Sequence, residues 1–386
     1  MIKILVNTIS SKNYAGGTFQ IAYNFLLKTL EHQDIEWYYI TSKDLDLVIG
    51  DKFRHLRNVK YYVFETQPDI KKTYWKVRKQ LKILEKQISP DVVYSIVAPS
   101  YFSFRSTEVM RYTYPWVTHP NEYSWKSLSL KDKIYYRIYG LVQKYLMRSA
   151  QYFITQTETC KKGIIDVTGL SESHVKVVEN VLPAVYNEMD VNPILDNYWV
   201  NIACIGKPVP HKNFDIIPDV LIELKKIGIN NVKFHTTIPD TYPLAKQIAS
   251  KLDNSGMIDN WVNYGRVSQQ TLGEIYRRCQ ICFLPTLLEV FSACTVEAMY
   301  FGLPTVATNF SFNSDVMGDS CLYYEPMNAK DAAIQICSLI NDYNLQSSLK
   351  EKMKKQLLMY GDYNKHFNSI KDFLVKVVLE KNNKLI

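Results

Sequence analysis

Several features that would decide the class of a protein are missing from this sequence of 386 residues. No apolar run approaches the roughly 18 residues needed to cross a bilayer. The N-terminal stretch, residues 1–7, is too short and too polar at its flanks for a secretory leader, and it has the pattern of a first β-strand. We therefore expect a protein that stays in the cytoplasm. The sequence also lacks internal repeats and low-complexity segments, so an ordinary globular fold is expected.

The cysteines provide no disulfide framework. They are odd in number and scattered through mostly apolar runs, at Cys160, Cys204, Cys279, Cys282, Cys294, Cys321 and Cys337. Cys279 and Cys282 have C-x-x-C spacing, but neither a second such pair nor a histidine pair follows them. We expect buried thiols that behave as small hydrophobic residues, in place of a metal or redox site.

The net charge of +8 is concentrated in two segments. Residues 71–88 and 126–148 are rich in lysine and arginine, and their only acidic residues are Glu85 and Asp132. Aromatic and aliphatic residues are interleaved with the charges, namely Tyr74, Trp75, Tyr135, Tyr136, Ile138, Leu141 and Tyr145. Two interpretations stay open: a helix that lies on an anionic membrane, or a solvated helix whose other side packs in the core. Nucleic acid is not expected as a partner, because no recognised binding motif accompanies the charge.

Short apolar runs alternate with helical patterns, which is typical of parallel sheets covered by helices. The expected strands are 2–7, 36–41, 91–97, 115–118 and 152–155, followed by 199–206, 231–236, 261–264, 281–285, 303–307 and 321–324. The stretch 180–193, with two prolines and three asparagines, is typical of a connector. We predict two Rossmann-like α/β domains, 1–184 and 199–360, with a hinge near 184–198 and a ligand in the cleft between them.

A paired glycine follows the first expected strand. Gly16 and Gly17 precede a helical pattern marked by Phe19, Ala22 and Leu30. Such a pair lets the backbone approach a ligand, and the helix N-terminus favours an anion. The pattern G-x-G-x-x-G is absent, which disfavours a dinucleotide-dependent oxidoreductase.

The most informative segment is 281–308. Its strand is expected to end at Pro285, Glu289 lies in the following loop, and Ser292 is a plausible N-cap for a helix over 293–301. The free N–H groups of that helix could face a diphosphate, while Glu289 and Glu297 accept hydrogen bonds from vicinal hydroxyls. By spacing alone, one acidic residue near a helix dipole and one exposed helical glutamate would explain the pattern better.

A family resemblance changes this balance. Glu289-x7-Glu297 followed by Ala-Met-x-x-Gly-Leu-Pro resembles the donor-site motif of retaining GT-B glycosyltransferases of the GT4 family (glycosyltransferase group 1). The stretches 264–267, 272–276 and 283–285 fit the same pattern in order and spacing. The resemblance implies a GT-B fold, with two Rossmann-like domains that face an interdomain cleft.

The resemblance also implies roles for residues outside this segment. Lys207 and Lys212 resemble the basic pair that clamps the donor diphosphate, and His119 resembles the histidine that faces the donor sugar. Glu289 would hold sugar hydroxyls and Glu297 ribose hydroxyls. The remaining donor-binding positions are Gly16, Gly17, Arg266, Val267, Phe291, Ser292 and Ala293. Residues 361–386 match the helix that returns to the N-terminal domain.

Three positions depart from the family pattern. Lys207 stands where arginine is commoner, and lysine lacks the bidentate fork. Ser292 replaces a glycine that brings the backbone near the sugar, and the segment 235–240 has no glycine-rich turn. These departures bear on the choice of donor.

The implied activity is transfer of a sugar from a nucleotide diphosphate donor to a glycan or lipid-linked acceptor, with retention and without a metal or other cofactor. The leading setting is bacterial surface polysaccharide, such as O-antigen, capsule or lipopolysaccharide, on the inner face of the plasma membrane. Two rivals stay open: a non-catalytic subunit that binds a sugar nucleotide, and a GT-B-fold epimerase that acts on the donor alone.

Overall fold

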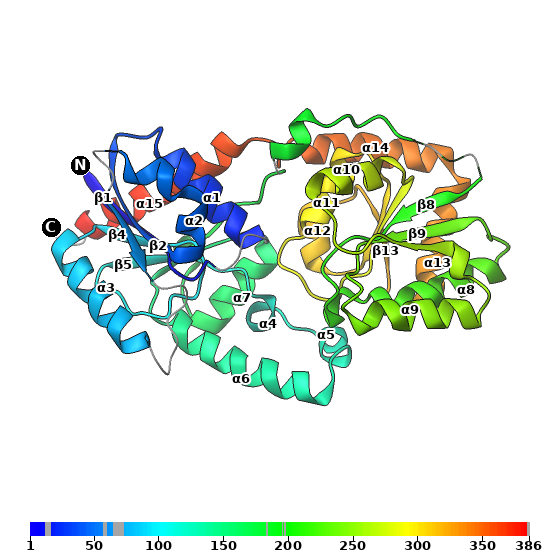
Figure 1. Cartoon of the computed structure of the whole chain (residues 1–386), viewed down its shortest axis with the longest axis horizontal. Helices are drawn as coiled ribbons and strands as arrows, with labels where there is room; N and C mark the ends of the chain where they lie inside the picture. The colour runs from blue at the N-terminus through cyan, green and yellow to red at the C-terminus, as the bar shows by residue number, and fades with distance from the viewer. Residues whose placement is uncertain are drawn as a thin grey trace.

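Two parallel β-sheets organise the chain. The computed structural model describes residues 1–11, 17–56, 60–64, 73–182, 184–194, 196 and 198–383. The first sheet has seven strands in the order β3-β2-β1-β4-β5-β6-β7, and the second has six in the order β10-β9-β8-β11-β12-β13. All neighbouring strands in both sheets pair in parallel. The two sheets lie side by side along the long axis of the molecule (Figure 1).

The N-terminal domain contains the first sheet and its covering helices. Its strands are β1 (Ile2–Thr8), β2 (Ile35–Ser42), β3 (Lys60–Phe64), β4 (Val92–Ser95), β5 (Thr107–Arg111), β6 (Tyr152–Thr155) and β7 (Val175–Val177). Its helices are α1 (Gly17–Thr29), α2 (Lys43–Arg54), α3 (Tyr74–Ile88), α4 (Pro115–Thr118), α5 (Glu122–Lys126), α6 (Leu130–Met147) and α7 (Glu158–Thr168), with a 3-10 turn η1 (Glu172–His174).

The C-terminal domain contains the second sheet. Its strands are β8 (Val200–Ala203), β9 (Val232–Thr236), β10 (Trp261–Asn263), β11 (Ile281–Leu284), β12 (Thr305–Thr308) and β13 (Leu322–Tyr324). The helices are α8 (Ile217–Lys226), α9 (Pro243–Asn254), α10 (Gln269–Arg277), α11 (Ala293–Tyr300), α12 (Ser311–Met317), α13 (Ala329–Asn341) and α14 (Tyr343–Leu357). The 3-10 turns are η2 (Ala184–Glu188) in the connector, η3 (Pro210–Lys212), η4 (Phe214–Ile216) and η5 (Ile258–Asn260).

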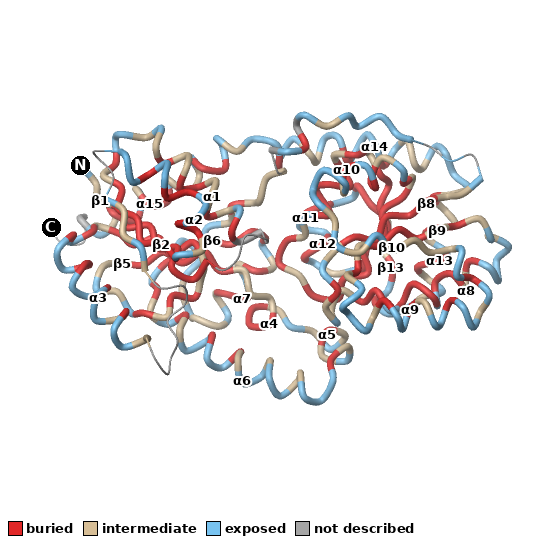
Figure 2. Tube along the Cα trace, viewed as in Figure 1, coloured by how far each residue is buried: buried red, intermediate tan, exposed pale blue. Residues whose placement is uncertain are grey.

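Alternation along β1 shows why the first sheet is covered on both faces. Ile4 and Val6 belong to one hydrophobic cluster, while Leu5 belongs to another on the opposite face. Successive strand residues point to opposite faces, so a strand that is apolar at every position must be buried on both sides. The burial pattern follows this arrangement, with buried strands at the centre and exposed helix faces outside (Figure 2).

The last helix, α15 (Tyr363–Asn383), returns to the N-terminal domain. Its residues Phe367, Ile370 and Leu374 lie in the cluster formed by β1 and α1. The Phe367 ring lies 5.0 Å from that of Phe25 in α1. The helix is drawn in red behind the blue α1 (Figure 1). The predicted fold, two parallel-sheet Rossmann-like domains with a returning C-terminal helix, is thereby confirmed.

The strand predictions differ in quality between the domains. All six expected strands of the second series are present, but β3, β5 and β7 were not predicted. The expected strand 115–118 is wrong, because these residues form α4. Pro115 occupies the first turn of this helix, where its missing N–H costs nothing, after Tyr114 in an extended conformation. The domain limits at 184 and 199 stay predictions.

The described part of the chain includes no helix with the length and apolar content to cross a membrane. All seven cysteines are free thiols, and six of them are buried, as predicted.

Candidate active site

The loop after β8 brings Lys212 to the cleft. Gly206 has φ 151°, a conformation that favours glycine, and the turn η3 ends at Asn213 with φ 55°. The side chain of Lys212 is only 12% exposed, and its Nζ lies 2.5 Å from Oε2 of Glu289. Lys207, at the start of the same loop, is exposed. The two predicted diphosphate ligands therefore differ, since Lys212 is buried and paired whereas Lys207 is exposed.

The charge of Lys212 is stabilised by its partner. Burial opposes the charged form, but the neighbouring Glu289 carboxylate outweighs this effect and leaves the pKa of Lys212 above its ordinary value. A lysine that stays charged in a dry site is suited to hold a diphosphate.

Glu289 lies in the loop between β11 and α11, and the N-terminal domain contacts this loop directly. His119, at the end of α4, has its Nε2 2.7 Å from the backbone carbonyl of Glu289. A carbonyl can only accept, so Nε2 carries the proton and donates it. Nδ1 lies 2.7 Å from the hydroxyl of Thr118. Burial lowers the pKa of His119, which favours the neutral ring at pH 7.

A second contact fixes the same loop. The side-chain amide of Asn121 donates to the carbonyl of Leu287 at 2.7 Å. Within the C-terminal domain, the backbone N–H of Leu287 donates to the carbonyl of His211 at 2.7 Å. The loop that carries Glu289 is thus held from both sides of the cleft.

Glu297, in α11, is 4% exposed. The hydroxyl of Tyr186 donates to Oε1 at 3.0 Å, and that of Tyr276 donates to Oε2 at 2.8 Å. Burial raises the pKa of the Glu297 carboxyl, although the two tyrosine hydrogen bonds oppose the change. Both oxygens predicted to read ribose hydroxyls are therefore already occupied by tyrosines, one of which comes from the connector.

A cavity of about 690 Å³ lies beside Glu297. It is lined by Phe291, Ala293 and Glu297 of the C-terminal domain and by Gln20 and Asn24 of α1. Residues 180–182, residues 361–364 and His366 also contribute to the lining. Ser292, between Phe291 and Ala293, is the N-cap of α11 but makes no capping hydrogen bond with its side chain. The start of α11 thus leaves N–H groups without a side-chain cap, close to a cavity shared by both domains.

The remaining predicted residues have no described contact with the Lys212–Glu289 pair. Gly16 lies outside the described residues, and Gly17 begins α1. Arg266 is exposed and Val267 half-buried, after Gly265 with φ 66°. Within the described ranges, no three His, Cys, Asp or Glu side chains form a group that could hold a metal ion.

Four residues at this site were not predicted: Asn121, Tyr186, His211 and Tyr276. Asn121, His211 and Tyr276 fall inside segments that resemble the family motif, so proximity in sequence was an available signal. Tyr186 lies in the connector, and nothing in its surroundings indicated a buried hydroxyl. The rings of His211 and Trp116 form a T-shaped contact with their centroids 5.4 Å apart. Burial lowers the pKa of His211 to about 4.

The fold and the cleft together define a GT-B protein. The structure of HepE from Anabaena in complex with UDP and glucose superposes with a TM-score of 0.68 at 13% identity, covering 97% of this chain and 100% of that chain. Residues 197–356 match the family model described as Glycosyl transferases group 1. The C-terminal part of the chain is therefore similar to group 1 glycosyl transferases.

Two curated relatives are similar to part of the chain. Mannosylfructose-phosphate synthase from Agrobacterium fabrum is 23% identical over 213 residues, which cover 49% of this chain and 45% of the relative. An uncharacterized 41.2 kDa protein in the cps region of Klebsiella pneumoniae is 21% identical over 233 residues, covering 58% of this chain and 60% of the relative. The matched part is thus about half of each relative.

Proposed function

We propose that this chain is a retaining glycosyltransferase that moves a sugar from a nucleotide diphosphate donor to a hydroxyl of a glycan or lipid-linked oligosaccharide. The observation that carries the proposal is the Lys212–Glu289 pair. It sits at the carboxyl ends of β8 and β11, where open parallel sheets bind ligands, and His119 of the other domain contacts its loop. The match of residues 197–356 to group 1 glycosyl transferases supports this assignment.

The proposed mechanism is electrostatic. Lys212, Lys207 and the N-terminus of α11 stabilise the charge on the departing diphosphate, while Glu289 holds sugar hydroxyls. The acceptor oxygen forms a bond to the anomeric carbon on the face from which the diphosphate leaves. The acceptor proton passes to an oxygen of the departing phosphate. In this route the side chains at the cleft hold the sugar and neutralise the diphosphate charge, and no metal ion is required. Transfer should therefore persist in the presence of a chelator.

The setting is also part of the proposal. The Klebsiella relative comes from a cps region, which supports a role in bacterial surface polysaccharide. The acceptor would then be presented at the cytoplasmic face of the plasma membrane, with the protein bound peripherally to anionic lipid.

The test is release of nucleoside diphosphate from a panel of sugar nucleotides, with and without acceptor glycans. Glu289→Gln and Lys212→Ala should each lower acceptor-dependent turnover by about 10²–10³-fold in folded protein. Lys251→Ala, which removes an exposed lysine of α9, is the matched control and should leave turnover unchanged. Full activity in either site variant would overturn the assignment.

The two rivals give different outcomes in the same assay. A non-catalytic subunit would bind a sugar nucleotide without turnover, and an epimerase would convert the donor with no acceptor present. Proton NMR of the product would report the anomeric configuration, and inversion would overturn the retaining mechanism.

A further inference from the structure

Helix α6 turns its apolar face toward solvent, whereas a surface helix of a globular protein normally turns it toward the core. Six large apolar residues recur along it at helical spacing and are 46–75% exposed: Leu130, Ile134, Ile138, Leu141, Val142 and Tyr145. Its buried residues are instead Gly140, Gln143 and Met147. A surface helix normally buries its apolar stripe and exposes its polar face.

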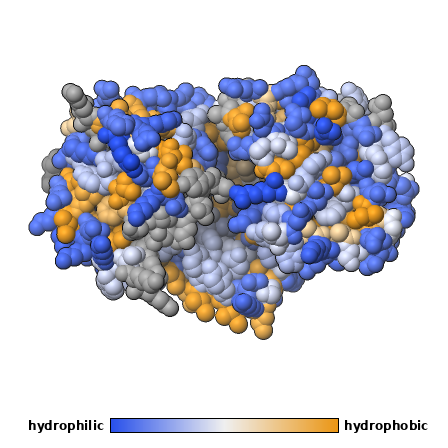
Figure 3. All heavy atoms as spheres, viewed as in Figure 1, coloured by the Kyte–Doolittle hydropathy of each residue, from blue (hydrophilic) through white to orange (hydrophobic). Residues whose placement is uncertain are grey.

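This outward stripe forms a continuous patch. In the space-filling view, hydrophobic atoms gather along the lower edge of the molecule, where α6 lies in Figure 1 (Figure 3). No other helix in the described part of the chain exposes more than two large apolar residues. Contiguous apolar patches of this kind mark surfaces that meet a partner or a membrane.

The charges around the stripe select the partner. Lys131, Arg137 and Lys144 of the same helix and its C-cap residue Arg148 are exposed. The only acid of the helix, Asp132, is half-buried beside the N-cap Ser129. Cationic residues that flank an exposed apolar helical face suit the headgroup region of an anionic membrane, where apolar side chains enter the acyl boundary.

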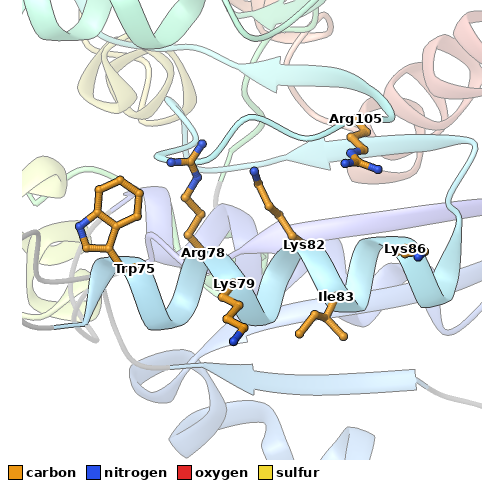
Figure 4. A pocket seen from close by; sticks show the side chains of 7 residues that line it. All are labelled: Trp75, Arg78, Lys79, Lys82, Ile83, Lys86 and Arg105. Carbon is orange, nitrogen blue, oxygen red and sulfur yellow. The ribbon is translucent and has the colours of Figure 1, made fainter.

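A second cationic surface lies on α3. Arg78, Lys79, Lys82, Lys86 and Arg105 line an open groove of about 490 Å³ beside the exposed Trp75 (Figure 4). The only acid of α3, Glu85, points inward and accepts from the backbone N–H of Arg105 at 2.6 Å. Among the described residues, none of the five cations has a carboxylate within ion-pair distance.

The stripe is linked to the cleft. Tyr136 of α6 stacks on Trp116 of α4 at 4.4 Å, and Trp116 packs against His211 of the loop that carries Lys212. His119 and Asn121, which hold the Glu289 loop, follow Trp116 within five residues. A partner bound along α6 would therefore lie next to the N-terminal side of the cleft.

We infer that the outward face of α6 is a membrane-docking surface, which inserts its apolar stripe into anionic lipid and holds the cleft beside the bilayer. This inference deepens the proposed function, since it names the surface through which a lipid-linked acceptor would be reached. Its test needs neither donor nor acceptor.

The experiment measures binding of the full chain to vesicles by flotation. The probes are phosphatidylcholine vesicles and vesicles of phosphatidylcholine and phosphatidylglycerol in equal parts. The triple variant Ile138→Ser, Leu141→Ser, Tyr145→Ser should bind anionic vesicles at least about tenfold more weakly than the wild type. Tyr343→Ser, Leu358→Ser, Met359→Ser, which removes three apolar residues of similar exposure in the C-terminal domain, is the matched control and should bind as the wild type does.

A charge variant tests the basic flank. Lys144→Gln with Arg148→Gln should weaken binding to anionic vesicles by about fivefold per charge and leave the little binding to phosphatidylcholine unchanged. Equal binding of the wild type to both vesicle types would overturn the role of anionic lipid. Equal loss in the triple variant and its control would overturn the role of α6.

The other occupants of this face are distinguished in the same series. The wild type could form a dimer in sedimentation velocity that the triple variant does not form, and fail to bind vesicles. That result would assign the face to a second copy of the chain and overturn the inference. Transfer to a soluble acceptor without vesicle binding would overturn the docking surface and leave the proposed function standing. Vesicle binding without any sugar transfer would instead overturn the proposed function.

Discussion

Glu297 is the residue whose structure departs most from its expected role. In the described conformation, tyrosine hydroxyls occupy the two oxygens that the family resemblance reserves for ribose. The two observations are compatible if ribose hydroxyls replace one tyrosine when a nucleotide binds. Tyr186 is the candidate for replacement, because it comes from the connector, whereas Tyr276 lies in α10 of the same domain as Glu297.

This exchange predicts the effect of Tyr186→Phe. The variant leaves one oxygen of a buried carboxylate unpaired in the free protein, which costs about 1–3 kcal/mol. A ribose hydroxyl would restore the lost hydrogen bond, so the nucleoside diphosphate should bind about five- to tenfold more tightly than to the wild type. Isothermal titration would measure the affinity, with Tyr323→Phe as the control, since its hydroxyl donates to the carbonyl of Gly318 away from Glu297. Weaker or unchanged binding would remove Glu297 from the ribose site.

Glu108 predicts a pH dependence of stability. It is 1% exposed in β5, where Ser95 donates to Oε1 at 2.6 Å, and burial raises the pKa of its carboxyl to about 8. Since this value lies above that of the unfolded chain, the folded state binds more protons between pH 4.5 and 8. Stability is therefore greatest at low pH in this window and falls as pH rises through about 8.

The variant Glu108→Gln keeps the shape and removes the titration. Its melting temperature should stay level while that of the wild type falls, with a difference in unfolding free energy of up to about 5 kcal/mol at pH 9. Thermal unfolding at pH values from 5 to 9 would show this. Parallel pH profiles for the two proteins would mean that Glu108 keeps an ordinary pKa.

The same residues show what the sequence could predict of the site. Glu289 and Glu297 lie in a local strand–loop–helix pattern, but their spacing alone favoured a plain helix start, and the family resemblance was needed to select them. The partners of Glu297 were not accessible in this way, because Tyr186 lies 111 residues away and reaches it only through the tertiary fold. Which hydroxyl meets a buried carboxylate depends on packing, and the sequence carries no local sign of it.

At the scale of elements, the missed strands have physical reasons. β5 reads Thr-Glu-Val-Met-Arg, which looks half-exposed, yet Glu108 and Arg111 are both buried. Their polar groups are satisfied by Ser95 and by Asn180, contacts that only the assembled sheet provides. β7 reads Val-Lys-Val, so the exposed Lys176 separates its only two apolar residues. Strands that follow the apolar pattern, including all six in the C-terminal domain, were predictable.

The N-terminus of α11 predicts a contrast between two N-cap serines. Ser268 caps α10 by accepting from the N–H of Thr271 at 3.1 Å, whereas Ser292 makes no such bond at α11. Ser268→Ala should therefore cost about 1 kcal/mol of stability, while Ser292→Ala should cost less than about 0.5 kcal/mol. Chemical denaturation would measure both. An equal loss in the two variants would show that Ser292 does cap its helix, and its N–H groups would then be less available to a diphosphate.

At the scale of the whole molecule, the two domains meet through polar contacts and through apolar packing around Leu288 and Val290. His119 and Asn121 bind backbone carbonyls of the Glu289 loop, and the backbone N–H of Thr159 donates to Asp315 at 2.7 Å. Thr159 lies in the first turn of α7, where a carboxylate is favoured by the helix dipole. Asp315 makes no printed hydrogen bond or ion pair with a predicted ligand residue, but its charge opposes the lowering of the pKa of His119. It therefore offers a way to loosen the cleft with only this indirect effect on the site.

Asp315→Ala should shift the protein toward a more open cleft. An exposed charge-assisted hydrogen bond of this kind contributes about 0.5–1.5 kcal/mol, so the closed form should lose roughly two- to tenfold in population. Small-angle scattering of the ligand-free variant should give a larger radius of gyration, and the KM for the donor should rise while kcat changes less. Asp319→Ala is the control, because Asp319 pairs with Lys352 inside the C-terminal domain. An unchanged radius of gyration would mean that the remaining interdomain contacts, among them those of His119 and Asn121, hold the cleft without Asp315.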